Sequence, residues 1–203
     1  MSAPSHLYTA DEALARLVAG NQRFVAGHAR FPTVQKEVLA DLAKGQHPYA
    51  TILGCSDSRV PPELIFDAGF GELFIIRVAG NVISPEVMGT LQYAGVHLRT
   101  PLFVVLGHEG CGAVAAALAT IDGAAQEPER IALLLDTIVP GVRDLPAGLP
   151  PHDRARVAVE ANVRWSMHQL LETAEAQVRA REGLVKLVGA VYELETGHVR
   201  FLD

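Results

Sequence analysis

The strongest constraint on the fold is a set of three short segments that are apolar over almost their whole length, residues 49–54, 73–79 and 102–107. A strand that is apolar on both faces is usually covered on both faces, as in parallel sheets. Segments with helical spacing lie between and after these strands, which is typical of α/β proteins. We therefore predict an α/β fold with a central, mostly parallel β-sheet flanked by helices.

Helix and turn signals complete this pattern. Thr9-Ala10-Asp11-Glu12 has the form of a capping box and predicts a helix to about residue 26. Ser84 followed by Pro85 predicts another helix start, with a helix to about residue 98. Further helices are expected over residues 34–44, 113–119, 131–139 and 153–181, with a loop over 140–151. The last two strand-like segments, 184–194 and 198–202, predict an antiparallel hairpin at one edge of the sheet.

The length of the chain predicts its domain organisation. With 203 residues it can bury one substantial core, whereas two independent domains would each be small. We expect a single domain over residues 1–203, made of an N-terminal helical arm (1–45) and a core (46–203). The arm could pack on its own core or on a neighbouring subunit.

Charge and composition narrow the function classes. A net charge of −6 without any Lys/Arg-rich run argues against nucleic acid as the main ligand. No apolar stretch approaches the roughly 20 residues of a membrane-spanning helix. Residues 1–12 have neither the basic region nor the apolar core of a secretory signal. Because two cysteines cannot build a disulfide scaffold, we expect a cytoplasmic protein.

Residues with metal-binding chemistry follow two of the predicted strands. Cys55 comes directly after the first strand, and His108 and Cys111 follow the third. The carboxyl ends of parallel strands meet at one edge of the sheet, where open α/β sheets bind ligands. A single free cysteine is more often a small buried hydrophobe. Here the only two cysteines and a histidine converge, and two cysteines with one histidine are the ligands of one type of catalytic zinc site.

Asp57 and Arg59 lie beside Cys55 at a spacing that allows a bidentate carboxylate–guanidinium pair. Elsewhere such a pair would be a surface ion pair of small energetic worth. Next to a metal ligand, Asp57 has two alternatives. It can bind the metal and close the site, or it can pair with Arg59 and leave the site open.

Three motifs in this order and spacing, C-S-D-S-R-V-P-P-E, R-V-A-G-N and G-H-E-G-C-G-A-V, resemble the β-class carbonic anhydrases. The resemblance extends from about Leu14 to the C-terminus. It implies that Cys55, His108 and Cys111 hold one zinc ion per chain, and that Asp57 and Arg59 form the dyad of the family. It further implies that the substrate pocket contains a hydrogen-bonding glutamine, aromatic wall residues and a backbone donor, which match Gln46, Phe74, Tyr93 and Gly112. By position alone, Phe74 in a strand and Tyr93 in a helix would more often be core residues.

The function that the resemblance implies is the reversible hydration of CO₂ to bicarbonate and a proton, through attack of zinc-bound hydroxide on CO₂. A relative on the same scaffold that hydrolyses COS or CS₂ is the alternative, because the ligand set does not discriminate between these substrates. The family forms homodimers or larger even-numbered oligomers such as tetramers, with the pocket shared between two chains.

The sequence departs from the family at a second pocket. Some bacterial members bind bicarbonate there with a Trp, an Arg and a Tyr, and switch between open and Asp-ligated zinc sites. Arg77 and Tyr192 match, but Ile52 stands at the Trp position. We therefore expect an open zinc site at neutral pH.

Overall fold

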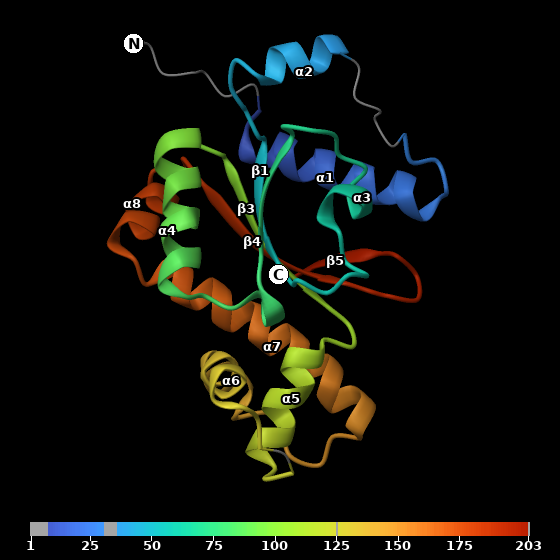
Figure 1. Ribbon diagram of the computed structural model, residues 1–203, viewed down its shortest axis with the longest axis vertical. Coiled ribbons are helices and arrows are strands. Elements are labelled where there is room, and N and C mark those ends of the chain that lie inside the picture. Colours follow the sequence, from blue (N-terminus) through green and yellow to red (C-terminus); the bar gives the residue numbers. More distant parts are fainter. Residues whose placement is uncertain (1–7, 31–35, 125, 203) are drawn as a thin grey trace.

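The computed structural model describes residues 8–30, 36–124 and 126–202 of the chain. Their strands form one sheet in the order β2-β1-β3-β4-β5 (Figure 1). The bounds are β1 Ala50–Gly54, β2 Leu73–Arg77, β3 Leu102–His108, β4 Lys186–Tyr192 and β5 Val199–Leu202. Neighbouring strands from β2 to β4 are parallel, and β5 runs antiparallel to β4. The predicted parallel sheet with an antiparallel edge hairpin is confirmed.

Helices follow most of the strands along the chain. They are α1 Ala10–Val25, α2 Lys36–Leu42, α3 Pro62–Ile65, α4 Pro85–Tyr93, α5 Gly112–Ile121, α6 Glu129–Val142, α7 Pro151–Leu171 and α8 Ala174–Arg181. A 3₁₀ turn, η1 (Ala79–Asn81), follows β2, and a π-helical turn, η2 (Ala94–Leu98), extends α4. Residues 34 and 35, where the second helix was predicted to begin, and residues 1–7 of the predicted arm lie outside the described residues. None of the helices in the described ranges is long and apolar enough to cross a membrane.

The sheet separates two apolar layers. Leu53 and Val105 belong to the cluster that contains α4, α5, α6 and α7, whereas Ile52 and Val104 belong to the cluster that contains α1 and α3. Successive strand residues point to opposite faces, so each central strand contributes to both layers. Every residue of β1 and β3 is buried as a result, which is the physical reason for their continuous apolar sequence.

Two helix predictions were wrong. The loop predicted from residue 140 begins later, because α6 continues through Pro140 to Val142. Ile138 and Val142 are buried against the core, and this burial outweighs the hydrogen bond that the proline lacks. The single helix predicted over residues 153–181 is broken between α7 and α8. Thr173 causes the break, because its side chain accepts a hydrogen bond from the Ala176 N–H and caps a new helix.

Helix α1 packs on the core of its own chain. It begins at the predicted capping box, with Thr9 and Glu12 bonded to each other's backbone N–H. Farther along, Asn21 is buried and joins three segments. Its Nδ2 donates to the carbonyls of Ile65 (3.3 Å) and Gly197 (2.8 Å), and its Oδ1 accepts from the Val199 N–H (2.9 Å). The arm is thus tied to the C-terminal hairpin, while the division of residues 1–203 into one domain with an arm stays a prediction.

We predict that Asn21→Ala lowers the free energy of unfolding by about 2–4 kcal/mol, because two buried carbonyls and one half-buried N–H lose their partner. Urea-induced unfolding measures this change. Gln22→Ala, on the exposed face of the same helix, is the matched control and should change stability by less than about 0.5 kcal/mol. Equal effects of the two substitutions would contradict the assigned role of Asn21.

Candidate metal centre

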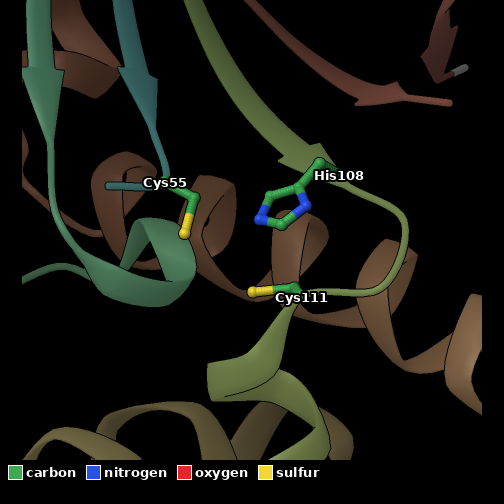
Figure 2. Close-up of side chains that lie close together, drawn as sticks. All are labelled: Cys55, His108 and Cys111. Carbon is green, nitrogen blue, oxygen red and sulfur yellow. The ribbon is translucent and has the colours of Figure 1, made fainter. Parts of the chain in front are cut away.

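The candidate ligands converge at the carboxyl edge of the sheet (Figure 2). Cys55 follows β1, His108 ends β3 and Cys111 precedes α5. The parallel pairing of Gly54 with Leu106 brings the ends of β1 and β3 side by side. The two sulfurs and one imidazole nitrogen lie within 4.8 Å of one another, and all three residues are buried. Metal binding, predicted from the strand ends, is thus supported by the geometry.

The ring of His108 is oriented for coordination. Its Nδ1 lies 2.8 Å from the carbonyl oxygen of Glu109. A carbonyl only accepts, so Nδ1 carries the proton and Nε2 presents a lone pair. Nε2 is buried and has no hydrogen-bond partner among the described residues. An orphaned nitrogen facing two buried thiols fits a borderline-soft cation such as zinc, whose thiolate and imidazole ligands lie about 3.5–4 Å apart in a tetrahedral site.

The hydrogen bond between Cys55 and Cys111 shifts the pKa values of the two thiols in opposite directions. A hydrogen bond from Cys111 lowers the pKa of Cys55 to about 4. The same bond, together with burial, raises the pKa of Cys111. Burial lowers the pKa of His108, but the neighbouring Cys55 thiolate and the Glu109 carbonyl outweigh this effect and leave the pKa raised. The hydrogen bond between the two thiols therefore favours the thiolate form of Cys55, the form that binds a cation.

Asp57 and Arg59 form the bidentate pair that their spacing allows. The Nε and Nη2 groups of Arg59 donate to the two oxygens of Asp57 at 2.9 and 2.7 Å, and the Arg59 backbone N–H donates to Oδ1 at 2.9 Å. These bonds hold the pKa of Asp57 well below its usual value. The carboxylate lies beside the cluster, with Oδ2 3.9 Å from His108 Nε2. Of the two alternatives for Asp57, the structure contains the pair with Arg59.

Arg77 braces the loop after β1. Its Nε donates to the carbonyl of Cys55 at 2.9 Å, and its Nη2 donates to the carbonyl of Asp57 at 2.5 Å. The guanidinium is therefore engaged with the backbone that carries a ligand and the dyad carboxylate. Ile52 is fully buried in β1, and Tyr192 ends β4 beside His108.

The predicted pocket residues do not all gather at this edge. Gly112 is the first residue of α5 and directly follows Cys111. Gln46 precedes β1, and Phe74 lies near the amino end of β2. Both therefore lie at the amino ends of the parallel strands, whereas the candidate ligands lie at the carboxyl ends. Tyr93 at the end of α4 stacks on Phe74 with ring centroids 6.2 Å apart. Tyr93 is 47% exposed, so it does not belong to the core of its own chain.

Comparisons with known proteins agree on one family. A sequence model described as carbonic anhydrase matches residues 50–199. Carbonic anhydrase 2 of Mycobacterium tuberculosis is 38% identical over 192 residues, which cover 92% of this chain and 90% of that protein. The carbonic anhydrase of Mycolicibacterium smegmatis is 39% identical over 181 residues, covering 89% and 87%. The structure of the β-carbonic anhydrase CcaA matches with a TM-score of 0.77 at 30% identity, covering 94% of this chain and 87% of that one.

The chain belongs to the β-carbonic anhydrase family. The sequence motifs predicted this family and an enzyme of its kind, and both predictions are confirmed.

Sequence reasoning missed one contact in this β-carbonic anhydrase site. The backbone N–H of Gly80, in turn η1, donates to the sulfur of Cys55 at 3.4 Å. The available signal was the Gly-Asn pair of R-V-A-G-N just after a strand, since both residue types are enriched at positive φ. Gly80 and Asn81 indeed have φ values of 70° and 45°.

We predict that zinc binds this β-carbonic anhydrase more tightly as the pH rises. Cys111 keeps its proton through neutral pH because its pKa is raised, and zinc must displace that proton. Below the raised pKa of His108 a second proton competes for Nε2, so the slope of log affinity against pH should steepen from about one towards two as the pH falls. Competition with a chelator from about pH 6 to 8 measures the slope. An affinity independent of pH would contradict the protonation states described above.

Proposed function

We propose that this chain catalyses the zinc-dependent, reversible hydration of CO₂ to bicarbonate and a proton, with one zinc ion per chain held by Cys55, His108 and Cys111. The observation that carries the proposal is the convergence of three buried donor atoms beside a carboxylate that an arginine holds in place. The zinc ion would supply a Lewis acid that lowers the pKa of water at the site. The matched carbonic anhydrase sequences and structures support the same reaction.

In this proposal, the Asp57–Arg59 pair orients the attacking oxygen. Asp57 is ionised over the working pH range, because Arg59 holds its pKa low. An ionised carboxylate only accepts hydrogen bonds, so Asp57 accepts a hydrogen bond from the attacking oxygen and thereby directs a lone pair of that oxygen towards CO₂. Arg59 keeps both Asp57 oxygens engaged, which disfavours Asp57 as a fourth ligand. An open site with three protein ligands is the arrangement of catalytic zinc centres.

Backbone and amide donors stabilise the charge that develops on the substrate oxygens. Gly112 begins α5, and the first N–H groups of a helix have no partner within the helix. Its N–H therefore donates to a substrate oxygen at the site. Gln46 would supply a second donor through its side-chain amide.

Gln46 requires a second copy of the chain to play this role. The length of β1, about 17 Å, separates it from the ligands of its own chain. Strand β2 is an edge of the sheet, and its apolar residues, together with Phe70 and Tyr93, are partly or largely exposed. An exposed edge strand can pair with another chain, and exposed apolar patches mark interaction sites. We therefore propose a homodimer, or a tetramer built from it, in which Gln46, Phe74 and Tyr93 of one chain complete the pocket of the other.

We also propose that the protein is cytoplasmic. Cys55 and Cys111 are free thiols in the structure. A reducing cytoplasm would keep them available to the metal, whereas an oxidising compartment favours disulfides between cysteines this close.

We predict rapid CO₂ hydration by the zinc-loaded protein near neutral pH, measured by stopped-flow from about pH 6.5 to 9. Asp57→Asn and Arg59→Ala should each keep zinc but lose at least about a hundredfold in kcat, because the orienting acceptor is removed or released. Cys111→Ser should lose the zinc. Asp144→Asn, which removes an exposed carboxylate after α6, is the control and should keep both zinc and activity.

Two results would overturn this assignment. Zinc content of one ion per chain in Cys111→Ser protein would show that the ligand set is wrong. Hydrolysis of COS or CS₂ by a zinc-loaded protein that does not hydrate CO₂ would replace the proposed reaction with the alternative on the same scaffold.

The shared pocket predicts complementation between inactive variants. A mixed dimer of Asp57→Asn and Gln46→Ala chains contains one site with both native residues. Random reassociation makes about half of the dimers mixed, so the mixture should regain about a quarter of the native activity. Asp57→Asn mixed with Arg59→Ala is the control and should regain none, because each site then lacks one dyad member. If Gln46 acted within its own chain, no mixture would regain activity.

A further inference from the structure

The sulfur of Cys55 accepts a hydrogen bond from a backbone turn that helix α7 holds in place. The donor is the N–H of Gly80 in turn η1, 3.4 Å from the sulfur. On α7, Asn162 Nδ2 donates to the Gly80 carbonyl at 2.8 Å, and Ser166 Oγ donates to the Asn81 carbonyl at 3.0 Å. Asn162 and Ser166 lie four residues apart on one face of the helix. All of these groups are buried.

The conformation of the turn needs this support. Gly80 and Asn81 both have positive φ, which is unfavourable for Asn81 because it carries a side chain. A Cβ at Gly80 would approach the Ile138 side chain to 2.7 Å and the Ala113 Cβ to 3.2 Å. The turn is therefore confined between α6, the start of α5 and α7. Without the α7 hydrogen bonds, two buried carbonyls would have no partner and the turn would relax.

Burying the amide of Asn162 carries a desolvation cost that an apolar side chain would not have. Its Oδ1 is buried and has no hydrogen-bond partner among the described residues. Leucine has a similar size and carries no polar atom to desolvate, but it would leave the Gly80 carbonyl without its partner, so the role of Asn162 is its hydrogen bond to the turn. The one hydrogen bond that Asn162 makes through Nδ2 ends on the residue whose N–H contacts a candidate metal ligand.

We propose that Asn162, assisted by Ser166, is a positioning residue for the metal centre, which fixes turn η1 so that the Gly80 N–H draws charge from the Cys55 sulfur. The inference rests on the proposed zinc site. Two thiolates neutralise the formal charge of a zinc ion, which weakens it as a Lewis acid compared with a site of neutral ligands. An N–H donor on one thiolate offsets part of that loss, and it also stabilises the thiolate against protonation.

The test compares Asn162→Leu and Ser166→Ala with the native protein. The probes are Zn²⁺, whose affinity is measured by chelator competition, and Co²⁺, whose sulfur-to-metal charge-transfer absorption reports the electron density on the thiolates. Asn162→Leu should weaken Zn²⁺ binding by about 10–100-fold and move the Co²⁺ band to longer wavelength. Ser166→Ala should change both in the same direction by less. Leu170→Ala, on α7 away from the turn, controls for general destabilisation and should leave the Zn²⁺ affinity within about twofold of native and the Co²⁺ band at its native wavelength.

The outcomes separate this inference from the proposed function. Native affinity and an unchanged Co²⁺ band in folded Asn162→Leu protein would overturn the positioning role and leave the zinc site intact. The same holds if Leu170→Ala shifts the band as much as Asn162→Leu does. A native protein that binds neither metal through Cys55, His108 and Cys111 would overturn both proposals. If Asn162→Leu fails to fold, the band of Ser166→Ala decides, and an unchanged band there counts against the inference.

Discussion

The parallel pairing of β1 with β3 is the constraint on which the rest of the site depends. Each strand is buried on both faces, so its register is fixed by apolar packing in two layers rather than one. With Gly54 opposite Leu106, the residues that follow both strands leave the sheet at the same place. Cys55 and His108 therefore come together because two apolar strands end together. A slip of one residue would turn the buried side chains of β1 to the wrong faces and carry Cys55 away from His108.

Hydrogen bonds from neighbouring groups then orient the side chains that the two strands bring together. Arg59 holds Asp57, Arg77 holds the backbone on either side of it, and the Glu109 carbonyl fixes the His108 ring. Arg77 belongs to β2, whereas Arg59 and Glu109 lie next to the groups that they hold, in the segments after β1 and β3. Metal affinity at such a centre typically falls about 10–100-fold when one of these outer partners is mutated.

Local patterns predicted the elements well where the chain carried strong local signals. The apolar strands, the capping box at Thr9 and the C-terminal hairpin were all readable, because each is decided by a few adjacent residues. The errors arose where tertiary packing overrode a local rule. Pro140 usually ends a helix, but burial of the residues around it carries α6 onward. Thr173 is compatible with a helix interior, but here its side chain caps a new helix.

By itself, the sequence determined the family, the parallel sheet and the three candidate ligands, because the motifs directly follow apolar strands whose ends meet at one edge. The tertiary structure decided which of the other residues share that edge. Gln46, Phe74 and Tyr93 lie across the sheet from the ligands, since a strand's length separates its two ends. It also brought Asn162 to turn η1, a contact between residues 82 positions apart. No local pattern encodes such a contact, because it depends on how α7 packs across the sheet.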